Sequence, residues 1–442
     1  MKKKILLVLI IIVILVGAGF AYAYYATDAF KTEKEMFFSY ILTDDVWTNF
    51  KNEELTEFMK KQQTTPFTIK GEIGANVSGN GMMTEGQSLE MLNKSKITFD
   101  GKSDVNKKLT EQVITLNMGQ AFNIPINFRI DGETVGIQSG FLNSKFIAVR
   151  NNNLKGLFKK FGIEGEEIPD KLEVSQEEFT EDEVKILKDK YFAILNDNLE
   201  EKSFSKEKIN NQTILTLRIS EEKFVDILLK ILETAYNDEL LLSKTIEKEE
   251  LKEQIEELMN MIKEAEISDT SIFEIKLYVE NKDVKKYEIQ VPIIEDNESI
   301  INIVIENTDT QVNIKISEDG ELFGEIGIYK ESNETYNMIV KLYNEDDINL
   351  QIDFNMQYLN LLELNNVEEK YEMKITLENT DKNSQFYQDT TEITVNYKDL
   401  ITFNENLEIE GLNNQNSIVL NDATEQELQN LMISIYQNLG LM

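Results

Sequence analysis

Alternation of apolar and polar residues with a period of two constrains the fold of this chain more than any other sequence feature. It fills two stretches, residues 66–150 and 271–412. Successive side chains of a strand point to opposite faces of its sheet, so this alternation is typical of strands with one buried face. In the second stretch about nine such segments follow one another. We therefore predict antiparallel sheets, each with one apolar face.

Segments with helical spacing of apolar residues precede, separate and follow these two stretches. A first helix is expected to have Thr43 as its N-cap and Phe58 on its apolar stripe, and to end in the polar residues 60–65. Residues 151–270 are expected to be mainly helical, with one strand at 213–219. The chain therefore combines sheets with a separate set of helices.

Capping boxes and Asp-Gly turns mark the ends of several elements. In a capping box, a Thr and a Glu three residues later bond to each other's free backbone N–H groups, so the pair predicts the start of a helix. An Asp-Gly pair beside alternating segments predicts a tight turn. The capping boxes are Thr180 with Glu183 and Thr424 with Glu427, and the turns are Asp100-Gly101 and Asp131-Gly132.

The order of these elements predicts an α+β fold. An open sheet with one apolar face needs a cover, so we expect antiparallel, curved sheets packed against helices in two sheet-bearing lobes. The predicted divisions are a transmembrane anchor or signal peptide at 1–27, an N-terminal α+β lobe at 28–270, and a C-terminal β-meander lobe with a terminal helix at 271–442. Residues 78–88, rich in glycine and polar side chains, are expected to form a loop.

The N-terminal segment predicts a membrane location. Residues 5–27 carry no charged side chain and follow three lysines. About 20 apolar residues cross a bilayer, and lysines in front keep that end in the cytoplasm. We therefore predict a single-pass anchor in the cell membrane, with the bulk of the chain extracellular. The alternative is a cleaved signal peptide, because Ala21-Tyr22-Ala23 matches the small-x-small pattern of a cleavage site.

Composition excludes most of the common catalytic and binding chemistries. The chain has no histidine and no cysteine, which excludes a Ser-His-Asp triad, a thiol nucleophile, disulfides and zinc sites of the usual kinds. The 80 acidic residues against 45 basic residues give a net charge of -35, which argues against nucleic acid as a partner. We expect no cofactor, and no catalytic, metal or ligand-binding residue is singled out by the sequence.

A calcium loop is the one metal motif that needs weighing. Asp381-Lys382-Asn383 has the alternating oxygen ligands with which such a loop starts. The glycine of the sharp turn and the terminal glutamate are missing at their required offsets. We therefore interpret this segment as an Asx-type turn after a strand.

The predicted anchor, the strand at 144–150 with the amphipathic segment 151–162 after it, and the long meander together resemble two groups of proteins. In architecture the chain resembles the cupped half-barrels of bacterial lipoprotein carriers and related extracytoplasmic lipid-binding lipoproteins. It is also similar to an uncharacterised family of membrane-anchored extracytoplasmic proteins of Gram-positive bacteria. The first resemblance implies a lipid held on a concave sheet face. The chain departs from the lipoproteins in lacking their lipid-bearing cysteine.

Three classes of function are compatible with these features. We expect a non-catalytic, membrane-anchored extracytoplasmic protein that binds an apolar or lipid ligand in a groove on a curved sheet. The first alternative is a structural component of the cell envelope that binds another envelope protein. The second is a hydrolase based on paired carboxylates, which suffice for glycosidases. A sizeable apolar cavity that is open to solvent in the interior of either sheet would favour the first class, a filled core the second, and convergent carboxylates the third.

Overall fold

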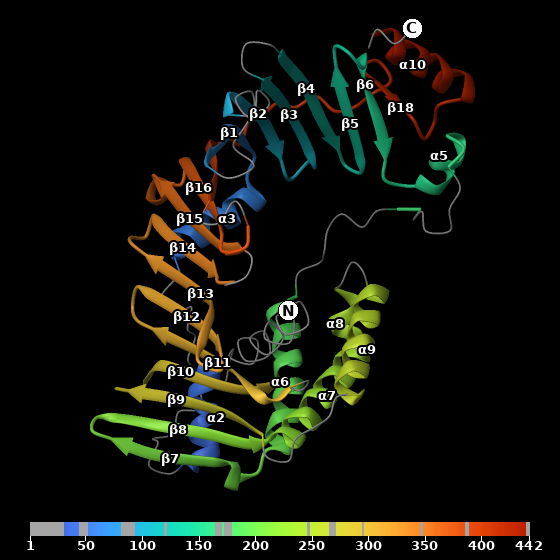
Figure 1. The fold of residues 1–442 in the computed structure, drawn as a ribbon. Coiled ribbons are helices and arrows are strands. Elements are labelled where there is room, and N and C mark those ends of the chain that lie inside the picture. Colours follow the sequence, from blue (N-terminus) through green and yellow to red (C-terminus); the bar gives the residue numbers. More distant parts are fainter. Residues whose placement is uncertain are drawn as a thin grey trace. The chain divides into compact units, whose positions relative to one another are not determined.

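The computed structural model describes most of the chain, and its contacts divide the chain into two compact units. The described residues are 31–43, 52–80, 93–118, 122–163, 170–171, 179–244, 248–264, 271–293, 296–344, 348–384 and 389–438. Unit 1 comprises residues 1–51, 173–329 and 341–343, and unit 2 comprises residues 52–172, 330–340 and 344–442. Antiparallel sheet and helices make up both units, as the α+β prediction requires (Figure 1).

Each unit is discontinuous in sequence, whereas the predicted lobes, 28–270 and 271–442, are continuous segments. The difference arises in unit 2, where β1 (Phe67–Gly79) pairs with β17 (Thr390–Phe403) along its whole length. Alternation shows which face a residue occupies, but it does not show which strand lies alongside. A pairing between strands so far apart in sequence therefore leaves no local signal.

The sheet of unit 1 is an antiparallel meander in which each strand pairs with the next. Its first strand, next to the predicted segment 213–219, was not foreseen from the sequence. The strands are β7 (Phe204–Ile209), β8 (Gln212–Ser220), β9 (Ile272–Glu280), β10 (Asp283–Ile293), β11 (Asp296–Asn307), β12 (Gln311–Glu318) and β13 (Glu321–Lys330).

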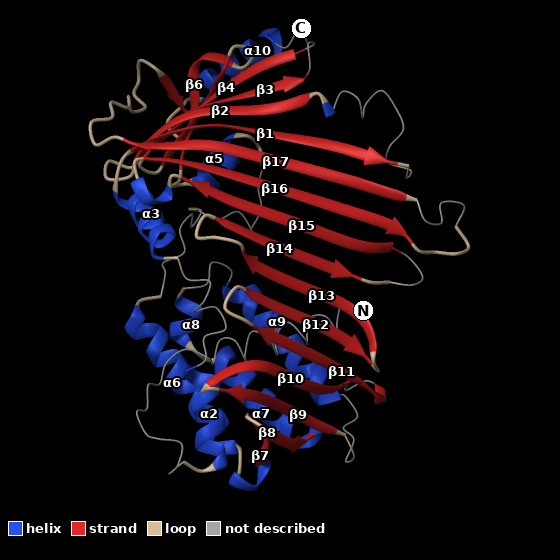
Figure 2. Cartoon of the chain, turned by 90° about the vertical axis from the view of Figure 1, so that its left-hand side faces the viewer, coloured by secondary structure: helices blue, strands red, loops and turns tan. Residues whose placement is uncertain are grey.

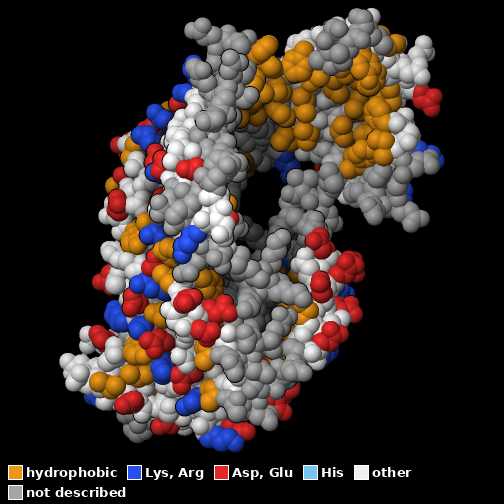
Figure 3. Space-filling view, viewed as in Figure 1, with side chains coloured by type: hydrophobic (Ala, Val, Ile, Leu, Met, Phe, Trp, Pro, Cys, Tyr) orange, Lys and Arg blue, Asp and Glu red, His pale blue; other side chains and the backbone are white. Residues whose placement is uncertain are grey.

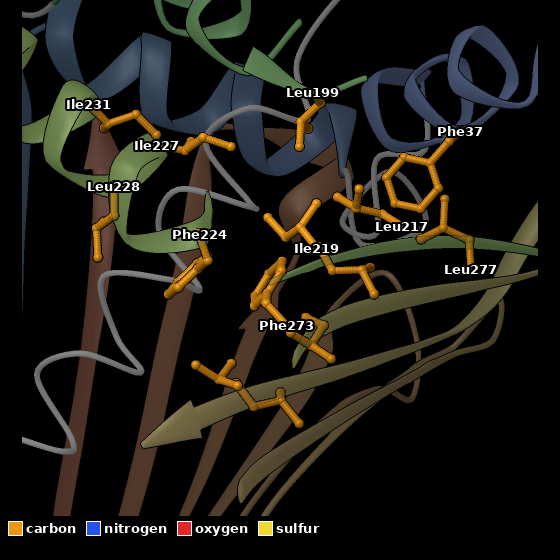
Figure 4. Packing of buried hydrophobic residues seen from close by; sticks show 14 of the residues in the cluster. Phe37, Leu199, Leu217, Ile219, Phe224, Ile227, Leu228, Ile231, Phe273 and Leu277 are labelled. Carbon is orange, nitrogen blue, oxygen red and sulfur yellow. The ribbon is translucent and has the colours of Figure 1, made fainter. Parts of the chain in front are cut away.

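Helices cover one face of the unit 1 sheet. Helix α2 contacts β7 and β8, α7 contacts β8 and β9, and α6 and α9 pack against α7. Phe224 of α7 stacks on Phe273 of β9 with ring centroids 4.3 Å apart, in the core shown in Figure 4. The helices are α2 (Glu33–Thr43), α6 (Glu181–Asn198), α7 (Glu221–Tyr236), α8 (Glu239–Ser243) and α9 (Lys248–Glu264).

The main sheet of unit 2 has the order β15-β16-β17-β1-β2-β3-β4-β5-β6-β18. Every pairing is antiparallel except that of β18, which lies parallel to β6. Figure 2 shows β15, β16, β17, β1, β2 and β3 side by side. The remaining strands are β2 (Ser95–Asp104), β3 (Leu109–Met118), β4 (Phe122–Asp131), β5 (Thr134–Ser139), β6 (Asn143–Arg150), β14 (Thr335–Leu342), β15 (Ile348–Leu359), β16 (Asn366–Asn379) and β18 (Ser417–Val419).

Three α-helices belong to the described part of unit 2: α3 (Glu53–Thr64), α5 (Leu154–Lys160) and α10 (Glu425–Asn438). The expected N-cap of the first helix is wrong, because Thr43 ends α2. Helix α3 instead begins after Asn52, whose side chain accepts a hydrogen bond from the Leu55 backbone N–H. It also runs through the polar residues at which it was expected to end.

Both predicted capping boxes are confirmed. The Thr180 side chain accepts from the Glu183 backbone N–H, and the Glu183 carboxylate accepts from that of Thr180. Thr424 and Glu427 make the same reciprocal bonds, of 3.3 and 2.8 Å, at the start of α10. Local side-chain bonding of this kind depends on sequence spacing alone, which is why it can be predicted.

One of the two predicted Asp-Gly turns is confirmed and the other is wrong. Gly132, with φ of +58°, lies in the tight turn between β4 and β5, where Asp131 pairs with Thr134. Asp100 and Gly101 instead lie inside β2. A Cβ on Gly101 would lie 3.2 Å from the Glu111 backbone oxygen, so this glycine permits a close approach of neighbouring strands.

Within the described ranges, no helix combines the length and apolar character that crossing a membrane would require. The predicted anchor at 1–27 lies outside the described residues, as do residues 44–51 of the expected first helix and most of the expected loop at 78–88.

Candidate functional site

The strand register defines one face of the unit 2 sheet, which we call the apolar face. Directly opposed residues of antiparallel strands share a face, and side chains alternate along each strand. One row of opposed residues crosses the sheet at Tyr358, Glu369, Asp399, Gly71 and Phe99. The apolar face therefore contains these residues and every second residue before and after them on each strand.

This face is apolar over most of its area and is open to solvent on the strands β2 to β5. Figure 3 shows hydrophobic side chains gathered over the part of the chain that holds β3 to β6. Patches of this kind on a soluble unit mark surfaces that bind a partner or a ligand. Large side chains left more than a third exposed here include Ile97, Met118, Phe122, Ile130, Val135 and Ile137.

The opposite face of the same sheet is charged or covered. Lys70 pairs with Asp100 at 2.9 Å, and Lys96 pairs with Glu72 at 3.2 Å. On β5, a Cβ placed on Gly136 would lie 3.0 Å from the side chain of Leu412, so the C-terminal segment covers this face there. The two faces thus differ in chemistry and in cover.

Two acidic side chains interrupt the apolar face. Among the described residues that the register assigns to this face on β15 to β17 and β1 to β5, Glu369 and Asp399 are the charged ones. They are directly opposed on β16 and β17. Charged groups on an apolar surface are costly to desolvate, so their presence needs a physical reason.

The Asp399 carboxylate is incompletely bonded. Its side chain is almost fully buried, with the residue 1% exposed. The Tyr397 hydroxyl donates a hydrogen bond to its Oδ2 atom, and the backbone N–H of Glu369 is near enough to the carboxylate to favour its charged form. The Oδ1 atom makes no hydrogen bond of normal geometry. Most buried polar atoms in proteins are bonded, so an unpaired carboxylate oxygen is an exception.

Both carboxyl groups of this acidic pair have raised pKa values. Burial raises the pKa of Glu369 to about 7, and the neighbouring Asp399 charge adds to the effect. Burial also raises the pKa of Asp399. No basic side chain in the described part of the chain is among the groups that shift either pKa. Within the described residues, therefore, no basic side chain supplies the pair with a counter-ion.

Aromatic rings surround the pair. Tyr371 and Tyr397 stack with ring centroids 5.2 Å apart, and Phe99 stacks on Tyr397 at 5.7 Å. The Tyr371 hydroxyl donates to the Tyr358 hydroxyl at 3.3 Å. A Cβ on Gly71 would lie 2.4 Å from Phe99 Cζ, so only a glycine at this position lets the Phe99 ring lie over β1 beside Asp399.

Helix α3 covers the same face at one end of β17. Phe58 packs edge-on against Phe403 with ring centroids 6.0 Å apart, and Lys61 Nζ lies 4.6 Å from the centroid of the Phe403 ring. Asn52, at the start of the helix, donates to the Tyr336 hydroxyl at 3.0 Å. On the apolar face, the row that holds Glu369 and Asp399 therefore has α3 toward one end of the strands and the open strands β2 to β5 to one side.

Neither acidic residue was predicted from the sequence, although their positions in the alternating strands carry a signal. On β16 and β17 the apolar side chains other than Leu400 occupy odd-numbered positions, such as Val367 and Ile401, and Glu369 and Asp399 occupy the same series. A charge at an apolar position of an alternating strand is the pattern that could have revealed them. Their pairing could not be foreseen, because it depends on the register.

Other candidate sites are weaker. Among the described residues, no group of acidic side chains is arranged to hold a metal ion. The segment considered as a calcium loop forms the predicted Asx-type turn, in which Asp381 Oδ1 accepts a bond of 2.8 Å from the Asn383 backbone N–H.

Comparison with known proteins does not identify a family. No protein-family description and no curated protein sequence matches the chain. Among solved structures, Salmonella typhi OmpF is 8% identical, with 77% of this chain and 98% of that chain covered and a TM-score of 0.15. Transferrin Binding Protein B from Haemophilus parasuis is 7% identical, with 76% of each chain covered and a TM-score of 0.13. Likeness at these TM-scores carries no argument about fold or function.

Proposed function

We propose that this is a non-catalytic binding protein that holds an apolar or lipid ligand on the apolar face of unit 2. The observation that carries the proposal is the row of large, exposed apolar side chains from Ile97 on β2 to Ile137 on β5. Covering apolar surface gains about 25 cal/mol per Å². An occupant that lies across several of these strands therefore gains binding energy without any change in the sheet.

The proposal places the protein outside the cell, attached to the membrane through residues 1–27. The uncharged run after the N-terminal lysines supports this location. A single-pass anchor would keep the apolar face near a source of lipid. The net charge of -35 would keep the exposed part of the chain in solution through self-repulsion.

A protein partner from the envelope is the first alternative, since it could cover the same surface. A carboxylate-based hydrolase is the second, because Glu369 and Asp399 are opposed and have raised pKa values. The exposed apolar side chains extend over the strands β2 to β5, whereas the acidic pair occupies one position on β16 and one on β17. Binding is therefore the function that this geometry supports better.

A direct-binding experiment with two matched variants tests the proposal. The full-length chain is purified in a delipidated form and titrated with decanol carrying a pyrene group. Val135→Lys places a charge on the apolar face, and Leu400→Lys places one on the opposite face of the same sheet; the native side chains are 43% and 42% exposed.

We expect saturable binding to the native protein and to the Leu400→Lys variant. Val135→Lys should weaken binding about tenfold, equivalent to about 1.4 kcal/mol. Absence of saturable binding, or equal weakening in both variants, would contradict the proposal. Mass spectrometry of material that co-purifies with the native chain then separates lipid from protein occupants.

A further inference from the structure

We infer that Glu369 and Asp399 form the polar end of the ligand site and hold the ammonium group of a cationic amphiphile. The inference rests on the proposed function, because it names the head group of a ligand whose apolar chain lies on the apolar face. Four features of the acidic pair and its surroundings support the inference.

One oxygen of the Asp399 carboxylate has unmet hydrogen-bonding capacity. Asp399 is buried, and its Oδ1 atom makes no hydrogen bond of normal geometry. Leaving a buried acceptor unbonded is costly, because it loses the hydrogen bonds that water would give it. A ligand N–H group at Oδ1 would remove that cost, so the site is better satisfied with a donor bound than without one.

The charge of the acidic pair favours a cationic ligand. Glu369 lies directly opposite Asp399, and no Lys or Arg of the described residues is among the groups that shift the pKa of either side chain. Two neighbouring carboxylates without a counter-ion repel each other and repel an anionic head group. A single positive charge is the ligand feature that relieves this repulsion, and hydrogen bonds between ammonium and carboxylate are stronger than neutral ones.

The third feature is the set of rings around the pair. Tyr371, Tyr397 and Phe99 form one stack beside the carboxylates. The faces of these rings are turned toward one another, so the stack forms an apolar wall beside the carboxylates. The surroundings therefore suit an organic cation with attached carbon better than a hydrated metal ion.

The apolar chain of the ligand has a path across the sheet toward the open strands. The row that holds Glu369 and Asp399 continues across the sheet through Phe99 to Ile114 on β3 and Ile126 on β4. An alkyl chain attached to the ammonium group can follow this row toward the open strands. The Phe99 ring lies over Gly71 beside Asp399, so the head group would have to displace this ring to reach the carboxylate.

The inference is tested by competition among three probes with the same chain length. Decylammonium, decanol and decanoate each displace pyrene-labelled decanol from the full-length protein at pH 8, where a primary amine remains protonated. We expect decylammonium to bind about tenfold more tightly than decanol, as one hydrogen bond to a charged group would give. Decanoate should bind most weakly.

Isosteric variants assign this preference to residues. Asp399→Asn and Glu369→Gln should each reduce the preference for decylammonium over decanol about tenfold. The preference is a ratio measured within each variant, so a general loss of binding does not change it. Glu72→Gln is the matched control, because Glu72 lies on the opposite face and pairs with Lys96. It should bind all three probes as the native protein does.

The outcomes separate this inference from the function on which it rests. If decanol binds and decylammonium binds no better, the pair is a buried acid pair that shares a proton, and the inference is overturned while the proposed function stands. If the preference survives in both Asp399→Asn and Glu369→Gln, the inference is also overturned. If none of the three probes displaces the label, the proposed function fails as well.

Discussion

The sheets of the two units have the same alternating sequence pattern and opposite surroundings. In unit 1 the apolar positions are closed off: Leu277 and Ile303 are 0% exposed, with α2 and α7 packed on the sheet. In unit 2 the apolar face is open on β2 to β5, where Phe122 is 58% exposed, although Val367 on β16 and Ile401 on β17 are buried. Alternation therefore predicts that a sheet has an apolar face, but not whether the chain itself covers that face.

In unit 2 the segments that cover the sheet lie mainly on its opposite face or at one end of its apolar face. Leu412 packs against Gly136, on the face opposite Val135 and Ile137. Helix α3 covers the apolar face only near the end of β17, where Phe58 meets Phe403. A covered face contributes stability as core, whereas an open one is available to a ligand, and this difference supports assigning the binding role to unit 2.

The largest effect we predict separates the two faces by stability. Ile303→Ala in unit 1 should reduce the free energy of unfolding by about 2–5 kcal/mol, because it leaves a cavity in a packed core. Ile137→Ala in unit 2 should cost less than about 1 kcal/mol, because the native side chain is already 36% exposed. Urea unfolding of both variants measures the difference. Equal losses would show that the unit 2 face is packed as tightly as the unit 1 face.

The second prediction concerns the pH dependence of stability. The pKa of Glu369 is about 7 in the folded chain, against an ordinary value of 4.5. Between these two values the folded state holds a proton that the unfolded state has lost, so the stability from this group decreases as pH rises through the interval. Glu369→Gln should remove that decrease. The groups that face Glu369 are Asp399, Tyr371 and Tyr358.

The measurement is the free energy of unfolding of the native protein minus that of Glu369→Gln, followed from pH 4.5 to pH 8. The difference should fall with rising pH and level off above about 7. A difference that is flat or that rises would contradict a raised pKa. Glu72→Gln, on the charged face, serves as the control and should show no such fall.

The third prediction tests a feature that both units share. Thr180→Ala in unit 1 and Thr424→Ala in unit 2 each remove a capping box, and each should cost about 1 kcal/mol. Thermal unfolding measures both. Probe binding should not change in Thr424→Ala, because α10 and its cap are not part of the apolar face; altered binding would show that the face depends on this helix.

The smallest effect is predicted on the charged face of unit 2. Lys70 and Asp100 form a salt bridge in which both side chains are more than half exposed. Lys70→Met should therefore change stability by less than about 0.5 kcal/mol. A larger loss would indicate that this face is covered in solution. Chemical denaturation with the native chain in parallel is sufficient to decide it.

Much of the local structure could be predicted from the sequence. The strands of both stretches, the two capping boxes and the turn at Asp131-Gly132 depend on residues close together in the chain. Asp100-Gly101 has the same turn chemistry and lies inside a strand, because a glycine also permits close packing of neighbouring strands. Local chemistry therefore gives an incomplete account wherever tertiary contacts compete with it.

The candidate site could be predicted only in part. That each sheet has an apolar face follows from alternation, and that much was expected; its role as a ligand surface remains a proposal. Which face remains open depends on the pairing of β1 with β17 and on where the helices pack, and both are long-range contacts. Glu369 and Asp399 stand at apolar positions of their strands, but their opposition is visible only in the register.

Fluorescence from labels placed on the two faces of the unit 2 sheet tests the central claim most directly. The native chain has no cysteine, so Ile137→Cys and Leu400→Cys each provide a single site for a bimane label, one on the apolar face and one on the opposite face. On titration with decylammonium, the label introduced by Ile137→Cys should shift to shorter wavelength with saturation, and that introduced by Leu400→Cys should not. Equal responses from both labels, or no response from the label on the apolar face, would contradict the assignment of this face as the ligand site.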